Sequence, residues 1–458
     1  MRRRVHLVGI GGAGLSAIAR VLHERGEQVT GSDQAVSAYS QALEASGIPV
    51  SYGHRAENVA GADLVVASSA VPMQNPEVQA AERSGIPVLR RNAFLGELTA
   101  GSKTIAIAGT HGKTTTTGLI AWLLASAGLD PTFIVGGILE DFQTNARAGK
   151  GPHFVIEADE YDRAFLALHP SIGVITSVEH DHPDCYPTPA DFRQAFEIFA
   201  SQVSELLLVC LDDPGSAALT SATAGRQTYG LHPEADWRAE EIRANAAGGL
   251  DFLVLRRGEL LGLARTRLAG LHNVVNSLAA LAAAEAAGVS FAEGRRALTE
   301  FHGTARRFQE VGEVGGVRVI DDYAHHPTEI RATLAAARQR YPEAEIWAVF
   351  QPHTYSRTRA LLEGFAASFG DAHHVIVTEV FASRETPDPA VSGRLIVERM
   401  MHPDVQFIPG LADAAESVIH RLRPPAVVLT LSAGDANEVG ARVLARLQSK
   451  AGGMQDGA

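Results

Sequence analysis

Residues 104–124, TIAIAGTHGKTTTTGLIAWLL, decide the fold of the middle of the chain. Residues 104–108 form a short apolar run that is typical of a buried strand, and residues 119–127 have the composition of a helix. Glycines lie between the two, where the backbone must turn tightly. The stretch therefore predicts a strand, a glycine turn and a helix in immediate succession.

The glycine turn also carries the side chains that a phosphate site requires. Glycines allow backbone N–H groups to surround a phosphate, Lys113 can bridge its oxygens, and the hydroxyl of Thr114 can ligate Mg²⁺. Ile107 occupies the position of the first glycine in the strict G-x-x-x-x-G-K-[ST] pattern, so a merely capped helix is the alternative. The preceding strand and the run of threonines after the lysine favour a phosphate-binding loop.

The same alternation of short apolar strands and helices continues on both sides of this loop. It predicts α/β units with parallel sheets. A chain of 458 residues is long enough for about three domains, and polar breaks occur near residues 100 and 303. We therefore expect an α/β protein with three domains, over residues 1–100, 101–303 and 304–448, followed by a disordered tail over residues 449–458.

Composition excludes several classes of protein. Hydrophobic residues make up 46% of the chain and charged residues 20%, which is typical of a globular protein. The formal net charge of −12 argues against a nucleic-acid partner. Cys185 and Cys210 cannot form a disulfide framework, and no apolar run reaches the ~18 residues of a membrane span. The basic, apolar start imitates a secretory signal, but His6 and several glycines interrupt it, so we expect a cytoplasmic protein without membrane insertion.

Two acidic strings follow strands in the middle segment. Glu157 ends an apolar strand, where a second Mg²⁺ ligand of a phosphate-loop protein would lie; a solvated acidic loop is the alternative. The later string, residues 179–184, contains histidines and carboxylates. It could bind zinc or a second Mg²⁺, and nearby phosphates favour Mg²⁺.

The N-terminal segment holds a second glycine turn, Gly9–Gly14, between a strand and a helix. It fits the G-x-G-x-x-G pattern, and Asp33 follows at a suitable distance for a ribose or base contact. Ser68 and Ser69 stand at another strand end. A phosphorylated ligand is predicted here, and an NAD-dependent dehydrogenase is the rival interpretation.

Polar strings also follow two strands of the third segment. Residues 321–329 and 351–359 contain paired histidines and several arginines, and loops at the carboxyl ends of strands are where open α/β sheets bind ligands. A helix cap made by Thr328 with Glu329 explains only part of the first string. We therefore expect a ligand to bind at these loops.

Taken together, the motifs resemble those of the Mur ligases of peptidoglycan synthesis. They occur in order along nearly the whole chain: GIGGAGLS, GSD, SSAV, GTHGKTTT, EADEYDRAF, VEHDHPD, GLHNVVNSLAA, GTARRF, DDYAHHPTE and QPHTYSRT. The resemblance implies a Rossmann-like N-terminal domain for a UDP-sugar, a central P-loop ATPase domain with a mostly parallel sheet, and a Rossmann-like C-terminal domain for an amino acid.

The resemblance also implies an activity, which is ligation of L-alanine to the carboxylate of UDP-N-acetylmuramate through an acyl phosphate. ATP and Mg²⁺ would be required, with Mn²⁺ as an alternative ion. The implied partners are these small molecules, and the implied assembly is a monomer or weak homodimer. A non-catalytic, ATP-gated sensor of UDP-sugars is the rival outside the enzymes.

Matching the motifs residue by residue implies a set of sites. The residues implied at the ATP site are Gly109, Thr110, His111, Gly112, Lys113, Thr114, Thr115, His272, Asn273, Asn276, Arg306, Arg307 and Asp322. Those implied at the UDP-sugar site are Gly11, Gly12, Ala13, Gly14, Asp33, Ser68 and Ser69. The implied metal ligands are Thr114, Glu157 and His182, and the implied amino-acid site consists of Tyr323, His325 and Arg357. The implied catalytic residues are Lys113, Glu157, His182, His325 and Arg357, with His325 as a candidate base.

The chain departs from the family's patterns at three places. Thr354 replaces the first arginine of QPHRYSRT, so Arg357 has less help in neutralising charge. Ser432 replaces the first glycine of a C-terminal GAGD string. The VEHDHPD string contains no lysine that could be carbamylated to bridge metal ions.

Overall fold

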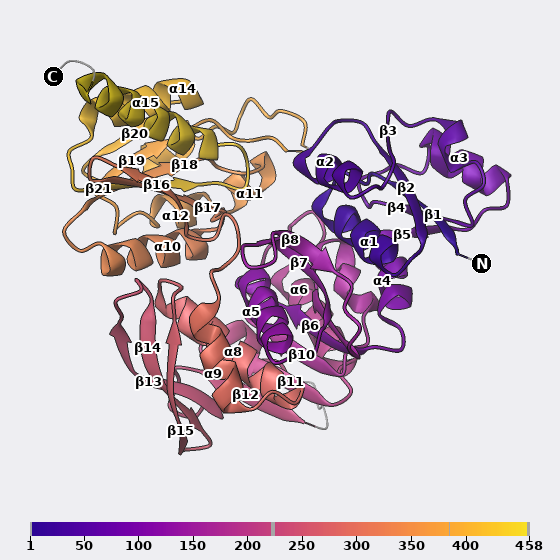
Figure 1. Cartoon of the computed structure of the whole chain (residues 1–458). Coiled ribbons are helices and arrows are strands. Elements are labelled where there is room, and N and C mark those ends of the chain that lie inside the picture. Colours follow the sequence, from indigo (N-terminus) through magenta and orange to yellow (C-terminus); the bar gives the residue numbers. More distant parts are fainter. Residues whose placement is uncertain (1, 221–224, 384, 456–458) are drawn as a thin grey trace.

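The computed structural model describes residues 2–220, 225–383 and 385–455. These residues form three α/β bodies, each built on a sheet of its own, as the alternating pattern predicted (Figure 1). In this view the N-terminal and C-terminal bodies both lie above the central one, the N-terminal body on the right and the C-terminal body on the left.

The N-terminal domain is a five-stranded parallel sheet in the order β3-β2-β1-β4-β5. Because all five strands are parallel, the turns after β1, β2 and β4 lie at the same edge of the sheet. Its strands are β1 (Arg4–Val8), β2 (Gln28–Asp33), β3 (Val50–Tyr52), β4 (Leu64–Ala67) and β5 (Val88–Arg90). Its helices are α1 (Ala13–Glu24), α2 (Ala38–Ala45), α3 (Pro76–Arg83) and α4 (Arg91–Thr99), with a 3-10 turn η1 (Ala56–Val59).

The central domain contains a ten-stranded sheet in the order β15-β14-β13-β12-β11-β10-β6-β9-β7-β8. Its middle is parallel and carries the phosphate loop between β6 and α5. The parallel strands are β6 (Lys103–Ala108), β7 (Thr132–Leu139), β9 (His153–Glu157), β10 (Ile172–Ile175), β11 (Leu206–Cys210) and β12 (Arg226–Gly230). The helical elements are α5 (Lys113–Ser126), η2 (Tyr161–Ala167), α6 (Pro189–Ser201), α7 (Pro214–Ala217), α8 (Leu271–Ala286) and α9 (Phe291–Glu300).

Antiparallel pairs occur at both ends of this sheet, which the βαβ pattern did not indicate. One end carries β8 (Thr144–Arg147), antiparallel to β7. The other end carries β13 (Trp237–Ala244), which is parallel to β12, followed by β14 (Leu250–Arg256) and β15 (Glu259–Thr266), each antiparallel to the strand before it. β14 alternates buried and more exposed residues, because one face packs on α8 while the other faces away from the core. The extension provides a platform for α8, whose first turn contributes to the site described below.

The C-terminal domain is a six-stranded sheet in the order β16-β17-β21-β18-β19-β20, parallel except for the edge strand β16. Apolar clusters cover both faces, as expected for a parallel sheet between helices. The strands are β16 (Gln309–Val314), β17 (Val317–Asp322), β18 (Glu345–Phe350), β19 (His374–Val377), β20 (Val405–Phe407) and β21 (Ala426–Leu431). The helices are α10 (Pro327–Arg340), α11 (Tyr355–Ala360), α12 (Leu362–Ala366), α13 (Arg394–Arg399), α14 (Leu411–Arg421) and α15 (Asn437–Gln455).

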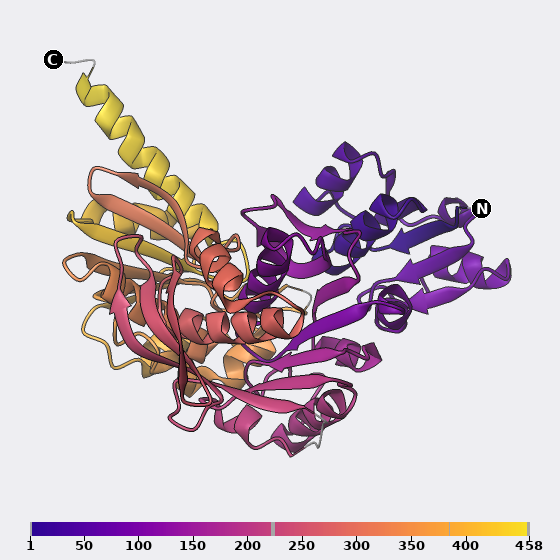
Figure 2. The same ribbon diagram turned by 60° about the horizontal axis from the view of Figure 1, so that its bottom comes forward.

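Helix α15 corrects the expectation of a disordered tail from residue 449. The helix continues through Gln455 and projects beyond the sheet that it packs on (Figure 2). Extending an established helix costs far less than nucleating one, so it can run past its last packed turn. Residues 456–458 lie outside the described residues. No helix in the described ranges, α15 included, has the length and apolar character needed to cross a membrane.

Apolar packing joins the N-terminal and central domains. Phe94 and Leu95 of α4 belong to the same buried cluster as Phe165 of η2 and Phe154 of β9. The C-terminal domain contacts the central domain through polar and charged side chains near the phosphate loop. The polar contact places most of the candidate functional residues at a boundary between domains.

Candidate active site

The phosphate loop has the conformation that its sequence predicts. Gly112 caps α5 with φ +79°, and a Cβ atom there would lie 2.7 Å from the Oδ1 atom of Asn276, so a side chain is excluded on two grounds. Lys113 begins the helix, and its ammonium lies 2.9 Å from the Oε2 atom of Glu160. The ammonium also donates to the carbonyls of Gly109 and Thr110.

Lys113 remains charged in this buried place. Burial alone would lower its pKa, but the negative charges of Glu160 and Glu157 raise the pKa above the ordinary value of lysine. Glu160 is therefore a partner that the sequence did not single out, although it belongs to the acidic string after β9. The ammonium has three donors and contacts Glu160 and two backbone carbonyls, so a phosphate that binds Lys113 must replace at least one of these contacts.

Thr114 and Glu157 meet as the metal prediction requires. The Thr114 hydroxyl donates to the Oε1 atom of Glu157 at 3.1 Å, and the backbone N–H of Gly136 donates to Oε2 at 2.7 Å. Burial raises the pKa of Glu157 despite the neighbouring Lys113. A carboxylate and a hydroxyl that share one cavity wall are the oxygen ligands that Mg²⁺ prefers, so these two residues fit the ion. His182 lies apart, with its Nε2 atom 3.6 Å from Glu160, on the wall of another cavity.

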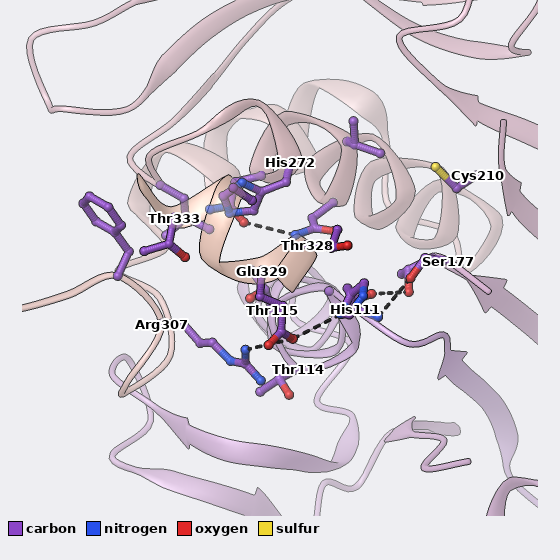
Figure 3. A pocket seen from close by; sticks show the side chains of 18 of the residues that line it. His111, Thr114, Thr115, Ser177, Cys210, His272, Arg307, Thr328, Glu329 and Thr333 are labelled. Carbon is purple, nitrogen blue, oxygen red and sulfur yellow. Dashed lines mark hydrogen bonds and ion pairs between the residues drawn. The ribbon is translucent and has the colours of Figure 1, made fainter. Parts of the chain in front are cut away.

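The first of three cavities at this boundary measures about 350 Å³ (Figure 3). It lies between the phosphate loop, the start of α8 and the C-terminal domain. Burial lowers the pKa of His272 to about 4, so this imidazole is neutral. The expected ATP-site residues on its wall are His111, Gly112, Thr114, Thr115, His272, Asn273, Asn276, Arg307 and Asp322. Two other wall residues, Thr328 and Glu329, belong to the 321–329 string that was expected to bind a ligand. Wall residues that the sequence reasoning missed include Ser177, Asp212, Tyr229 and Thr333, of which Ser177 could have been found because it follows a strand.

Arg306 and Arg307 have different surroundings. Arg307 lines the first cavity. Arg306 pairs with Asp321 at 3.0 Å and donates to the carbonyls of Ser432 and Gly434, within its own domain. It does not line the first cavity, so Arg307 is the better placed of the two for the nucleotide.

His111 joins the central and C-terminal domains above this cavity. Its Nε2 atom lies 2.9 Å from Glu179 of the central domain, and its Nδ1 atom lies 3.2 Å from Glu329 of the C-terminal domain. Burial lowers the pKa of His111, but the two carboxylates outweigh it and raise the pKa to about 9. Thr328 also donates to Glu179, at 2.8 Å. A protonated imidazole therefore bridges the two domains.

The zinc alternative for residues 179–184 receives no support from this geometry. Among the described residues, one group of three potential ligands could surround an ion, and it consists of His111, Glu179 and His326. Only Glu179 belongs to the string that we considered.

The second cavity measures about 550 Å³ and is bounded by all three domains. Of the expected UDP-sugar residues, Ala13 and Gly14 line it. Asp33 is the last residue of β2, and Gly11, Gly12, Ser68 and Ser69 lie in turns at the same edge of the N-terminal sheet. The sequence reasoning missed Tyr39 and Arg91 on this wall, and Arg91 pairs with Asp159 of the central domain at 3.0 Å.

Gly11 and Asp33 hold the glycine turn in place. The backbone N–H of Gly11 donates to the Oδ2 atom of Asp33 at 2.8 Å. A Cβ atom on Gly11 would lie 2.9 Å from the same oxygen. The turn therefore depends on glycine here because of this close approach.

The third cavity measures about 270 Å³ and contains the expected amino-acid residues Tyr323, His325 and Arg357, together with His182. Burial lowers the pKa of His325 to about 3. Such a weak base holds a proton poorly, which argues against the base role expected for His325 and favours a neutral hydrogen-bonding role. His353, also on this wall, lies with its Nδ1 atom 3.3 Å from Arg357.

The three cavities adjoin one another in a definite order. Thr114 lines the first and the second, and Asp159 and Tyr323 line the second and the third. A nucleotide phosphate, a carboxylate and an amine could therefore meet near Thr114, Asp159 and Tyr323.

Comparison with known proteins identifies the class. The model of the Mur ligase family, catalytic domain, matches residues 4–103, the Mur ligase middle domain matches residues 107–284, and the Mur ligase, glutamate ligase domain, matches residues 306–434. The chain belongs to the Mur ligase family.

Within this family, full-length relatives point to one kind of enzyme. The UDP-N-acetylmuramate–L-alanine ligase of Salinibacter ruber is 46% identical over 94% of this chain and 92% of its own length. The ligase of the same name from Roseiflexus castenholzii is 43% identical over 96% of this chain and 97% of its own. The crystal structure of UDP-N-acetylmuramate–alanine ligase from Thermotoga maritima superposes with a TM-score of 0.82 at 31% identity, covering 98% of this chain and 99% of that one. A murein peptide ligase from Psychrobacter arcticus has a TM-score of 0.71 at 26% identity, covering 97% and 98%.

Proposed function

We propose that this protein joins L-alanine to the carboxylate of UDP-N-acetylmuramate at the expense of ATP, giving UDP-N-acetylmuramoyl-L-alanine, ADP and phosphate for peptidoglycan synthesis. The observation that carries this proposal is the row of three adjoining cavities, in a chain whose full-length relatives have this activity. In that order the cavities suit ATP, the sugar's carboxylate and the amino acid.

The chemistry explains why three ligands must meet. A carboxylate does not accept an amine at neutral pH, because hydroxide is a poor leaving group. Transfer of the γ-phosphoryl group to the carboxylate forms an acyl phosphate and releases ADP. The amine of alanine then attacks the acyl carbon, and the amide bond forms as the C–O bond to phosphate breaks. The phosphate leaves with the bonding electrons and takes up the proton that the amine loses.

Residues of this chain supply positioning and charge for the first step. Lys113 would leave Glu160 to hold the transferring phosphoryl group, and the backbone of the glycine turn would donate to its oxygens. Thr114 and Glu157 would hold Mg²⁺, or Mn²⁺ in its place, which neutralises phosphate charge when bound. Arg307 reaches the same cavity from the C-terminal domain. No protein nucleophile is needed.

The second step takes place under the closed C-terminal domain. Arg357 and Tyr323 would orient alanine in the third cavity, with His325 as a neutral hydrogen-bonding partner. Contact between the domains excludes water, which would otherwise hydrolyse the acyl phosphate. We place the reaction in the cytoplasm and propose a monomer or weak homodimer, which sedimentation would test.

A phosphate-release assay with the purified protein tests the proposal. We expect release that requires ATP, Mg²⁺, UDP-N-acetylmuramate and L-alanine together, with the ligated product detected by mass spectrometry. Phosphate release that ignores either acceptor would instead support an ATP-gated sensor. Tight NAD binding without UDP-sugar binding would support the dehydrogenase interpretation and overturn the proposal.

A further inference from the structure

A buried ion pair connects the central and C-terminal domains at the third cavity. Arg357 belongs to α11 of the C-terminal domain, and Asp181 belongs to the loop after β10 of the central domain. Their side chains are only 8% and 7% exposed, and the Nη2 atom of Arg357 lies 3.1 Å from the Oδ2 atom of Asp181. The two side chains form a salt bridge across the domain boundary.

The contacts of the guanidinium leave one of its edges available. The Nε and Nη2 atoms donate to Asp181 at 3.1–3.2 Å, so the carboxylate takes the edge that these two nitrogens form. The Nη1 atom lies 3.3 Å from the Nδ1 atom of His353. Guanidinium carries five N–H donors in a planar arrangement, so the edge formed by Nη1 and Nη2 can still donate hydrogen bonds to a second carboxylate.

Arg357 can reach a ligand, whereas Asp181 cannot do so directly. Arg357 lines the third cavity, and Asp181 does not. Asp181 can therefore affect an amino acid in this cavity only through neighbouring side chains, and Arg357 is the neighbour whose side chain donates hydrogen bonds to it. Thr354, on the same cavity wall, has a neutral side chain and provides no second cation. A long, flexible arginine side chain has many rotamers, and a contact with a second group besides the ligand holds the side chain in one of these rotamers.

Other charged groups around Asp181 do not replace Arg357. The Nε2 atom of His182 lies 3.8 Å from Asp181, and it lies slightly closer, at 3.6 Å, to Glu160. Three hydrogen bonds join Asp181 to Arg357. The strongest connection of Asp181 is thus to the arginine of the opposite domain.

We propose that Asp181 is a positioning residue for the amino-acid substrate. From the central domain it holds one edge of Arg357 and thereby presents the other edge to the carboxylate of alanine. The amino-acid site is consequently complete only when the C-terminal domain has closed on the central domain. This inference rests on the proposed function, because it concerns the amino acid of that reaction.

Steady-state kinetics of Asp181→Asn test the proposal. We expect the KM for L-alanine to rise at least tenfold, while the KM values for ATP and UDP-N-acetylmuramate change less than threefold. Asp388→Asn is the matched control. Asp388 pairs with Arg359, an exposed arginine on the same helix, α11, as Arg357, so this substitution should leave all KM values unchanged. An unchanged alanine KM in Asp181→Asn would overturn the proposal. A lower KM would also overturn it, by showing that Asp181 competes with the substrate.

A double-mutant cycle distinguishes positioning from a general structural effect. If Asp181 acts through Arg357, adding Asp181→Asn to Arg357→Lys should raise the alanine KM by less than threefold beyond the single Arg357→Lys change. Multiplicative effects would overturn the proposal. Should Asp181→Asn not fold, Asp181→Glu keeps the charge and shifts the carboxylate by one methylene; we expect at least a threefold rise in alanine KM, and no rise would count against us.

Wild-type measurements keep this test separate from that of the proposed function. If the wild-type protein forms no alanine-dependent product, the proposed function fails. If the wild type is active and Asp181→Asn has the same alanine KM, only the positioning role fails.

Discussion

Replacing Lys113 by alanine should reduce both turnover and stability, and the structure allows the two effects to be separated. Lys113 is the cation nearest to Glu160, whose side chain is 2% exposed, at 2.9 Å. Removing one partner of a buried ion pair costs about 3–5 kcal/mol, because the other charge stays buried. At about 2–4 °C per kcal/mol for a domain of this size, the melting temperature should fall by roughly 6–20 °C. His182 lies 3.6 Å from Glu160 and remains as a neighbour of the carboxylate, so we expect a fall in melting temperature near the lower end of this range.

The loss of turnover has a different cause. The ammonium would neutralise the transferring phosphoryl group, and a preorganised charge of this kind contributes about 3–4 kcal/mol, or 10²–10³-fold in kcat. Adding Glu160→Gln to Lys113→Ala removes the stranded charge. The double variant should therefore regain most of the lost melting temperature while turnover stays low.

Differential scanning fluorimetry and the phosphate-release assay measure the two quantities on the same samples. Lys113→Arg, which keeps the positive charge, is the control for stability and should melt within a few degrees of the wild type. Near-normal turnover in Lys113→Ala would refute the role of the ammonium. A double variant as unstable as the single one would refute the explanation by Glu160.

Three further predictions concern the other cavities and the domain contact. Gly11→Val should raise the KM for UDP-N-acetylmuramate at least tenfold and leave ATP binding unchanged, because even a Cβ atom meets Asp33; calorimetry with both ligands checks this. Arg357→Lys should lower kcat/KM for alanine at least tenfold, about 1.4 kcal/mol, since lysine cannot hold two carboxylates by two edges; equal alanine kinetics would contradict it. The pKa of His111 is raised to about 9 from 6.5, so the stabilisation that its proton gives to the domain contact is complete below pH 6.5 and is lost as pH rises through 9. This stabilisation is on the order of 3 kcal/mol at most. Scattering should show the domains opening over that pH range, and His111→Gln should abolish the pH dependence.

Much of the fold could be predicted because its signals are local. The glycine turns after β1 and β6 lie between a strand and a helix that are contiguous in sequence, so strand, turn and helix are encoded within about twenty residues. Parallel strands bring their carboxyl ends to one edge, so residues such as Asp33 and Glu157 were expected at ligand sites. Thr114 beside Glu157 followed from this rule.

Contacts between distant segments could not be predicted in this way. Lys113 with Glu160, Arg91 with Asp159, and Asp181 with Arg357 join residues 47, 68 and 176 positions apart. The hydrophobic periodicity of the sequence does not predict such a pair, because the partners belong to different elements or different domains. The helical end of the chain was also missed, since its composition suggests disorder while the preceding turns of α15 favour continuation.

The sequence by itself thus determined the three α/β units, the phosphate loop and the kinds of ligand that the strand ends can hold. Only the tertiary structure decided which charges meet across the domain boundary, namely His111 with Glu329 and Arg357 with Asp181. The physical reason is that these two kinds of interaction act over different separations along the chain. Backbone conformation follows from neighbouring residues, whereas the pKa of a buried group and the orientation of an arginine depend on partners that arrive only when the domains pack together.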